Sequence, residues 1–508
     1  FQVSRCSPPS VLTFADMETL LSLNLSKNSI RTLNDSSFVN THIRILDLSY
    51  NQLQDLDFLK NCLTNLTVFN VSNNNIQVIS QNAFENQQQM LNLDLSMNNI
   101  IRIEERSLPL LKFLDLSNFN ITRIDEYAFV DLPVLAGLNL SHNQIRNIAL
   151  TNFRGVNNMH SLDISYNKLP ILRITNAMAN LTALYLNNNK LKDVSKIFRD
   201  PFYVDISRDV LPSLTTLNLA HNDIKYFNNR KINTLSTLKE LKLSFNELNT
   251  VNLSYFKDLK SIDLSNNYLT YINSMFLENV ENLESLDVSR NKITLLQPGT
   301  FQFMENLKVL NLSANSLTEI RNRSLQGLNN TQVMDISKNA LTSLDVELFQ
   351  KCNELKTLII DNNRIKSLDI DRLLFLVPTL STISLGGNPI SCRIFFLRIG
   401  PVNSSVSIRR VIVTSIDKIY HGDNVYGIKC GDNDTDVTTN KPEADSAESS
   451  SVVPLVLWPV LTISLISIGA LVIYKKYHNK NRYRVYPVNR ISKSALEVNV
   501  SVSSIIDE

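Results

Sequence analysis

The sequence predicts an α/β solenoid, a coil of short repeats with a parallel β-sheet on its concave side, followed by one transmembrane α-helix. The coil is predicted by the template L-x-x-L-x-L-x-x-N-x-L, which matches the chain sixteen times, most often at a spacing of 24 residues. The helix is predicted by 23 uncharged residues at Val452–Tyr474, followed at once by lysines and arginines.

The asparagine position of the template defines a ladder along the chain. It falls at Asn28, Asn51, Asn74, Asn98, Phe119, Asn143, Asn167, Asn189, Asn222, Asn246, Asn267, Asn291, Asn315, Asn339, Asn363 and Asn388. In the preceding L-x-L the two leucines share one face of a strand, and the residue between them faces the other way. We expect each ladder amide to bond backbone groups that the turn leaves unpaired, because such groups are costly when buried.

A second column of residues stands ten positions after the ladder. It consists of Phe38, Phe84, Phe129, Phe153, Phe256, Phe301 and Phe349. Regular spacing in a solenoid favours core packing over a ligand site. These rings are therefore predicted to fill the convex side of the coil.

The template and its spacing make the chain resemble the extracellular leucine-rich-repeat proteins of the 24-residue type, over roughly Leu20 to Cys430. The resemblance implies a leucine-rich-repeat horseshoe with a concave parallel β-sheet, here sixteen repeats over residues 20–390. Fifteen steps of about 4.8 Å would make the sheet roughly 70 Å long.

Two irregularities interrupt the pattern. Phe119 occupies the asparagine position of a repeat only 21 residues long, so either Asn118 or Asn120 replaces the amide or the ladder has a gap. Between Asn189 and Asn222 the spacing rises to 33, which predicts an insertion at about residues 191–213. The insertion is either a neutral loop or a loop that contributes to a partner site or bends the coil.

Caps are expected at both ends of the solenoid, because its end repeats expose core. Residues 1–19, with Cys6, resemble the remnant of an N-terminal cap. Residues 391–430 resemble the family's C-terminal cap, which begins N-P-x-x-C, and this resemblance implies a disulfide between Cys392 and Cys430. The family's usual second cysteine is Ile394 here. Cys62 and Cys352 are expected to be buried thiols, although a Cys6–Cys62 bridge remains open.

The remaining segments predict a membrane topology. Residues 431–451 are acidic and polar and read as a disordered stalk, and residues 452–474 read as the transmembrane helix. The basic residues that begin the tail, 475–508, place that tail in the cytoplasm and the N-terminus outside. We therefore expect a single-pass type I protein of the plasma membrane. Because the chain begins at Phe1, it is either a mature protein or a fragment.

Several function classes are disfavoured. A net charge of +2 gives no bulk attraction for nucleic acid. No nucleophile, zinc-protease or phosphate-binding motif is present, and the six histidines are scattered, so we expect no catalytic residue, no cofactor and no metal site.

Thirteen Asn-x-Ser/Thr sequons before the predicted membrane segment predict a glycoprotein. Four of them, Asn24, Asn70, Asn139 and Asn311, arise from the repeat's own strand and are expected to be used less. The predicted glycosylation sites are Asn34, Asn65, Asn120, Asn180, Asn252, Asn322, Asn329, Asn403 and Asn433.

The residue between the two strand leucines faces the concave side and is Asp or Asn in twelve of sixteen repeats. Tyr185 and Lys242 depart from this default near the insertion, and Tyr166, His221 and Phe245 stand just before nearby ladder positions. Aromatic and basic residues on a rigid surface are the usual anchors of a protein interface. We therefore interpret these five residues as a partner-binding patch, with ordinary surface variation as the alternative.

The function predicted from these features is that of a cell-surface receptor or adhesion protein. Its partner would be an extracellular protein or the same protein on a neighbouring cell. The ectodomain resembles those of Toll-like receptors and of neuronal and epithelial repeat proteins, but the 34-residue tail is too short for a Toll-type signalling domain. Two alternatives stay open: an immune or pattern-recognition co-receptor without its own signalling domain, and a membrane scaffold for a secreted enzyme.

Overall fold

The computed structural model describes most of the predicted coil and parts of the segment that follows it. The described residues are 13–390, except 109, 131, 173–177, 195–210, 228–234 and 255, together with the short strands at 412–414, 424–425 and 428–429. Residues 1–12 and the predicted stalk, membrane segment and tail lie outside the described residues. No helix within the described part has the length and apolar composition needed to cross a membrane.

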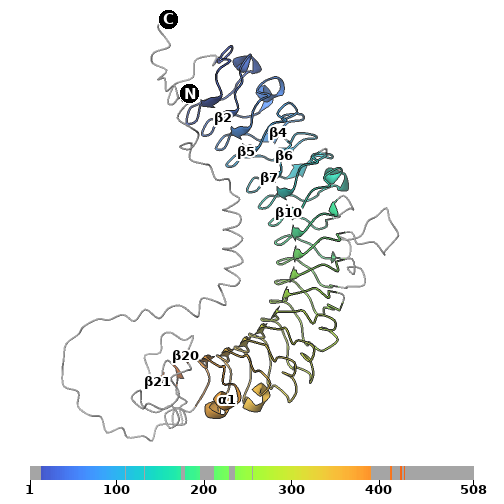
Figure 1. The fold of residues 1–508 in the computed structure, drawn as a ribbon, viewed down its shortest axis with the longest axis vertical. Coiled ribbons are helices and arrows are strands. Elements are labelled where there is room, and N and C mark those ends of the chain that lie inside the picture. Colours follow the sequence, from blue (N-terminus) through green and yellow to red (C-terminus); the bar gives the residue numbers. More distant parts are fainter. Residues whose placement is uncertain are drawn as a thin grey trace, which may run out of the picture. The chain divides into compact units, whose positions relative to one another are not determined.

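Each of the sixteen predicted repeats contributes one three-residue strand, and all of these strands pair in parallel along the inner side of a curved coil (Figure 1). The first sheet contains β1 (Ser22–Asn24), β2 (Ile45–Asp47), β3 (Val68–Asn70) and β5 (Asn92–Asp94). The second contains β7 (Phe113–Asp115), β9 (Gly137–Asn139), β10 (Ser161–Asp163), β11 (Ala183–Tyr185), β12 (Thr216–Asn218), β13 (Glu240–Lys242), β14 (Ser261–Asp263), β15 (Ser285–Asp287), β16 (Val309–Asn311), β17 (Val333–Asp335), β18 (Thr357–Ile359), β19 (Thr382–Ser384) and β20 (Ile412–Thr414).

The other described elements are short. They are β4 (Val78–Ile79), β6 (Arg102–Ile103), β8 (Arg123–Ile124), the antiparallel pair β21 (Asn424–Val425) and β22 (Ile428–Lys429), the 3-10 helices Asp35–Phe38, Asp57–Asn61, Leu150–Phe153 and Val346–Phe349, and the helix α1 (Ile370–Leu376). The α1 helix is capped at its N-terminus by the side chain of Asp369, which accepts a hydrogen bond from the Arg372 backbone amide at 3.0 Å.

The asparagine ladder is confirmed. The Asn246 Nδ2 donates to the carbonyl oxygen of Leu243 in its own repeat and to that of Leu219 in the previous repeat, both at 3.0 Å. Its Oδ1 accepts a hydrogen bond from the Ile224 amide at 3.1 Å. The same three contacts recur at nearly every ladder asparagine after Asn28, so each amide joins two neighbouring turns of the coil.

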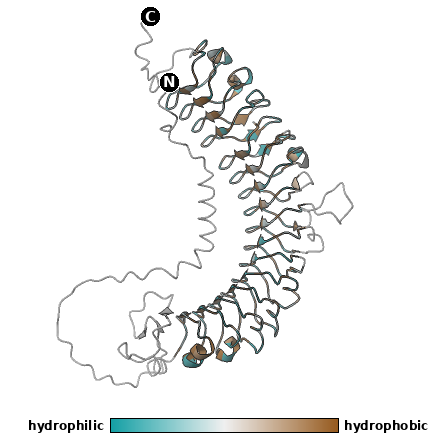
Figure 2. Cartoon of the chain, in the orientation of Figure 1, coloured by the Kyte–Doolittle hydropathy of each residue, from teal (hydrophilic) through white to brown (hydrophobic). Residues whose placement is uncertain are grey.

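The core consists of the two leucine columns and the phenylalanine column, so apolar residues recur at every turn (Figure 2). All seven predicted phenylalanines are buried, and the rings of Phe129 and Phe153 lie 5.4 Å apart in a stack. Cys62 and Cys352 are buried free thiols, as predicted, and burial raises the pKa of each to about 12. Cys6, Cys392 and Cys430 lie outside the described residues.

The ladder has a gap at Phe119, whose ring is buried in the asparagine position. Neither neighbour replaces the amide: Asn118 bonds the Ser117 hydroxyl at 3.1 Å, and Asn120 bonds the side chain of Asn99 at 2.8 Å. The inner sheet is interrupted at the same place, between β5 and β7. A ladder amide normally joins adjacent turns. Its absence here, in a repeat of 21 residues where 24 is the commonest length, accounts for the separation of β5 from β7.

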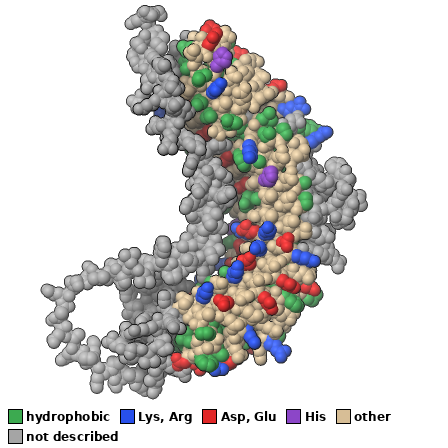
Figure 3. Space-filling model, viewed as in Figure 1, with side chains coloured by type: hydrophobic (Ala, Val, Ile, Leu, Met, Phe, Trp, Pro, Cys, Tyr) green, Lys and Arg blue, Asp and Glu red, His purple; other side chains and the backbone are tan. Residues whose placement is uncertain are grey.

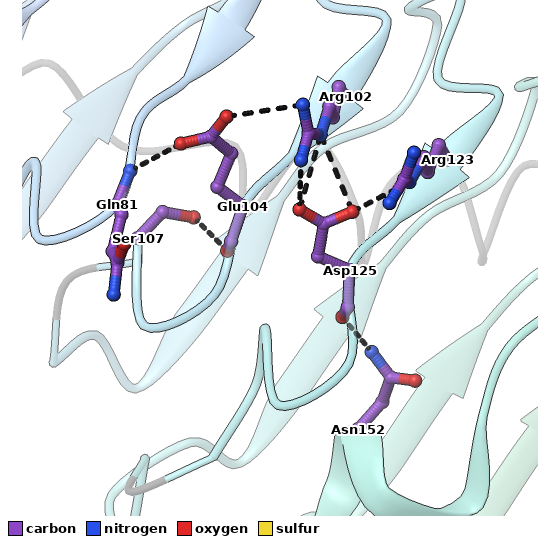
Figure 4. A network of polar contacts seen from close by, with 7 residues as sticks. All are labelled: Gln81, Arg102, Glu104, Ser107, Arg123, Asp125 and Asn152. Carbon is purple, nitrogen blue, oxygen red and sulfur yellow. Dashed lines mark hydrogen bonds and ion pairs between the residues drawn. The ribbon is translucent and has the colours of Figure 1, made fainter.

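A second set of contacts joins the turns around this gap. The strands β4, β6 and β8 form a parallel sheet of their own, further out than the inner strands in Figure 1. In Figure 4 the Arg102 guanidinium on β6 binds Asp125 after β8 at 2.6 Å, and Asp125 also accepts from Arg123 at 2.8 Å. The Asn152 side chain donates to the Asp125 carbonyl oxygen at 2.7 Å, which extends the network to the next repeat. The guanidinium of Arg102 lowers the pKa of Asp125, so this ion pair persists at neutral pH.

Replacing a ladder asparagine should destabilise the coil far more than replacing an exposed one. Asn291 bonds two buried carbonyl groups, of Leu264 and Val288, and accepts from the Leu269 amide. We expect Asn291→Ala to lower the free energy of unfolding by about 2–4 kcal/mol, because buried backbone groups lose their partners. Thermal and denaturant unfolding of the full chain would measure this. The control is Asn282→Ala, which removes one exposed bond; equal effects of the two substitutions would contradict the role of the ladder.

Candidate protein-binding surface

The residue just before each ladder position forms a ridge along one edge of the coil. In all sixteen repeats this residue has a positive φ. The ridge consists of Lys27, Tyr50, Asn73, Met97, Asn118, His142, Tyr166, Asn188, His221, Phe245, Asn266, Arg290, Ala314, Lys338, Asn362 and Gly387. A positive φ suits Gly and Asn and costs other residues roughly 1–2 kcal/mol. The backbone therefore does not explain why aromatic rings stand here.

Four rings of the ridge form two matching stacks. The rings of His142 and Tyr166 lie 4.0 Å apart with planes at 11°, and those of His221 and Phe245 have the same separation and angle. Asn188 stands between the two pairs along the ridge. Tyr166 and Phe245 each remain 46 % exposed. Stacking holds these side chains in one orientation, so little conformational entropy remains to be lost when a partner binds.

The other two predicted patch residues lie on the inner sheet. Tyr185 on β11 is half-buried, and burial, followed by the charges of Glu240 and Asp163, raises its pKa to about 12. Lys242 on β13 forms an ion pair with Glu240 at 3.0 Å. The structure therefore places the five predicted residues in two groups, three on the exposed ridge and two on the sheet beside it.

His142 and Glu240 are missing from the residues singled out in the sequence. His142 lies one repeat before Tyr166 in the same column, and that spacing is the signal from which the stack could have been predicted. Phe113 is a further exposed ring on the inner face, 53 % exposed, and it lies over Gly137. A side chain at position 137 would meet the Phe113 ring at 2.7 Å, so the glycine makes room for it.

Carboxylates with a raised pKa follow the inner sheet toward its C-terminal end, and they are half-buried at Asp287 and buried at Asp361. Burial, followed by repulsion from Asp263, raises the pKa of Asp287 on β15 to about 6. Asp361 is fully buried, and neither of its carboxylate oxygens has a hydrogen-bond partner. Ser384 and the Gly386 backbone lie close enough to lower its pKa, but burial dominates and raises it to about 6. No group of His, Cys, Asp or Glu in the described part of the chain could hold a metal ion.

The asparagines of the sequons differ in solvent exposure. Asn34, Asn120, Asn180, Asn252 and Asn322 are exposed, Asn65 and Asn329 are half-buried, and Asn403 and Asn433 lie outside the described residues. The four strand asparagines are also half-buried, and each accepts a hydrogen bond from the amide of the serine two residues on, at 2.9–3.0 Å. Whether these sites carry glycans stays a prediction.

Protein-family models of leucine-rich repeats match more than half of the chain. The model described as "Leucine rich repeat" matches residues 10–53, 64–118, 109–169 and 281–341. That described as "Leucine Rich repeats (2 copies)" matches residues 41–81, and "BspA type Leucine rich repeat region (6 copies)" matches residues 211–308. None of these matches indicates an enzyme family.

Two known proteins share short stretches with this chain. Tsukushi of Xenopus tropicalis is 32 % identical over 127 residues, which is 24 % of this chain and 36 % of Tsukushi. Leucine-rich repeats and immunoglobulin-like domains protein 2 of Mus musculus is 32 % identical over 113 residues, which is 22 % of this chain and 11 % of that protein. The chain therefore spans only a minor part of either relative.

Solved structures share the fold. The functional domain of InlJ from Listeria monocytogenes superposes with a TM-score of 0.52 at 20 % identity, covering 72 % of this chain and 74 % of that one. A leucine-rich-repeat protein of Leptospira interrogans superposes with a TM-score of 0.50 at 22 % identity, covering 73 % and 93 %. At these identities the likeness confirms the parallel-sheet solenoid alone.

Asp361 should make stability depend on pH. Its folded pKa of about 6 lies above the ordinary 3.8, so its charged form destabilises the fold above pH 6, and this cost disappears as the pH falls toward 4. Asp361 lies two residues before the ladder asparagine Asn363, and twelve of the other repeats have serine at the corresponding position. We therefore expect Asp361→Ser to raise the free energy of unfolding by about 1–3 kcal/mol at pH 8.

The measurement is thermal unfolding of the full chain and of the Asp361→Ser variant at pH 8, 6 and 4. The advantage of the variant should shrink across this range. A constant difference at all three pH values would contradict the role of the buried charge. Asp369→Ser, at an exposed helix cap, provides the control for a simple exchange of Asp for Ser.

Proposed function

Because the chain is a leucine-rich-repeat protein, we propose that its solenoid binds a protein partner outside the cell and acts as a cell-surface receptor or adhesion protein. The observation that carries this proposal is the pair of His–aromatic stacks on the ridge of repeats six to ten. Exposed, pre-oriented aromatic rings are the side chains that most often dominate the binding energy of protein interfaces.

Two neighbouring features support this surface. Tyr185 and the Lys242–Glu240 pair lie on β11 and β13, next to the ridge, and add polar groups beside the aromatic anchors. A central set of rings with a polar border is the usual arrangement of a protein interface. No predicted glycosylation site in the described residues falls on the ridge between His142 and Phe245.

The finer proposal is a single-pass type I protein of the plasma membrane. It rests on the uncharged segment 452–474, on the basic residues that follow it and on the density of sequons before it. The partner is an extracellular protein or a second copy of this chain on a neighbouring cell. The Cys392–Cys430 disulfide belongs to the same proposal, because such bonds persist outside the cell.

Removing the ridge rings should abolish partner binding without unfolding the coil. Otherwise non-adhesive cells would express the full chain or its Tyr166→Ala/Phe245→Ala variant and would be mixed with differently labelled cells that lack it. Clumping among expressing cells identifies the chain as its own partner, and capture of the other cells identifies a different surface protein. We expect the variant to lose at least about tenfold in adhesion, because two exposed anchors are truncated.

The matched control is Tyr268→Ala/Tyr271→Ala. These two rings are 45 % and 48 % exposed, in repeat eleven and outside the ridge. Surface expression of both variants would be checked by antibody. Unchanged adhesion of the Tyr166→Ala/Phe245→Ala cells would refute the ridge as the binding surface.

A further inference from the structure

A strip of basic side chains lies beside the ridge on repeats six to eight. After each ladder asparagine the chain alternates outward and inward, so the residues one and three positions after it are outward. In repeat eight Lys190 and Lys192 are exposed, while Asn189 before them and Leu191 between them are buried. Arg146 of repeat six and Lys168 of repeat seven occupy the same outward positions and are exposed. We call these four side chains the basic strip.

Backbone hydrogen bonds hold two of the four residues, Lys168 and Lys190, in register with the repeat before each of them. The Lys168 amide donates to the Ile145 carbonyl oxygen and the Lys190 amide to that of Leu169, each at 2.9 Å. Successive repeats in such a stack are about 4.8 Å apart. The strip therefore holds four cations on three consecutive turns, at a spacing set by the fold rather than by flexible loops.

The columns that form the strip contain no acidic side chain, and the nearest one in the chain is the exposed Asp193, directly after Lys192. No Asp or Glu occupies the ridge position or the two outward positions of repeats six, seven and eight, where the other residues are His142, Gln144, Tyr166, Pro170 and Asn188. Among the described residues no carboxylate pairs with any of the four cations. The strip ends at repeat nine, where Asp223 takes the first outward position and Lys225 pairs with Glu247 at 3.4 Å.

Several cations elsewhere on the coil are neutralised. Glu284 binds both Lys260 at 3.0 Å and Lys308 at 2.7 Å, which lowers the pKa of Glu284. The face drawn in Figure 3 shows Lys and Arg beside Asp and Glu over its lower half. Like charges on adjacent turns repel each other, so an unneutralised row is unfavourable for the free protein. An anion that covers the row relieves this repulsion.

We propose that the basic strip binds a linear sulfated polysaccharide. A regular row of cations at a fixed spacing complements a chain whose anionic groups repeat. Gln144 and Asn188 supply amides that can bond sugar hydroxyl groups. A single-stranded nucleic acid is disfavoured because the outward positions that form the strip carry no aromatic side chain on which successive bases could stack. This site is additional to the protein-binding ridge and does not depend on it.

The test is retention of the purified full chain on immobilised heparin. We expect Lys190→Glu/Lys192→Glu to weaken apparent heparin affinity at 0.15 M salt by about tenfold or more, and to lower the salt concentration needed for elution. The matched control is Arg364→Glu/Lys366→Glu, which makes the same charge change at the same two positions of repeat fifteen. At these two positions the neighbouring repeats contribute Ala340, Thr342 and Pro389, and one cation, Lys338, stands on the adjoining ridge. The control should elute as the native chain does.

Other outcomes overturn the proposal. An equal loss of heparin affinity in the strip variant and in the control would show that binding depends on overall charge alone. No loss of heparin affinity in either variant would exclude the strip as the binding site. Release by polyglutamate as readily as by free heparin would assign the strip to an acidic protein instead. Lys190→Gln/Lys192→Gln removes the charges without reversing them and should give a smaller loss in the same direction. The Tyr166→Ala/Phe245→Ala variant should keep its heparin affinity, so failure of the ridge and failure of the strip can be told apart.

Discussion

The structure depends on the ladder of buried asparagine amides. Every turn of the coil would otherwise leave backbone carbonyl and amide groups inside without partners, because three-residue strands satisfy only part of the backbone. One amide joins its own turn to the previous turn through two donated bonds and one accepted bond, as at Asn246. This requirement fixes where each repeat turns, and therefore fixes the register of every column of side chains on the outside.

The gap at Phe119 shows how far this requirement extends. A buried ring can fill the space of the amide but can neither donate nor accept a hydrogen bond. The inner sheet ends at β5 and begins again at β7, although the leucine columns continue through the gap. Continuity there is supplied from the other side of the turns, by the β4–β6–β8 sheet and by the pair between Arg102 and Asp125. Apolar packing alone therefore does not keep neighbouring strands paired.

Most of the fold could be predicted from the sequence because it is encoded by position. The sixteen strands, the phenylalanine column and the ladder gap all follow from the spacing of residues. The interruption of the sheet did not follow, because the template records side chains and not the pairing between strands. The surface was predicted less well for a related reason. The spacing put Tyr166 and Phe245 on an outward position but did not show that each stacks on a histidine one repeat earlier, or that Tyr185 is half-buried.

The columns also separate the roles of the exposed charges. A lysine that meets a carboxylate one turn away, as Lys260 meets Glu284, contributes to a neutral and soluble surface. Lys168 and Lys190 instead occupy the same position of adjacent repeats, on backbone that hydrogen bonds hold in place. The backbone hydrogen bonds stabilise these turns by more than the repulsion between the cations destabilises them. The repulsion is therefore retained in the folded protein. A ligand that relieves it gains binding energy without having to order the backbone of the site, and that is the physical reason to expect an anionic partner at repeats six to eight.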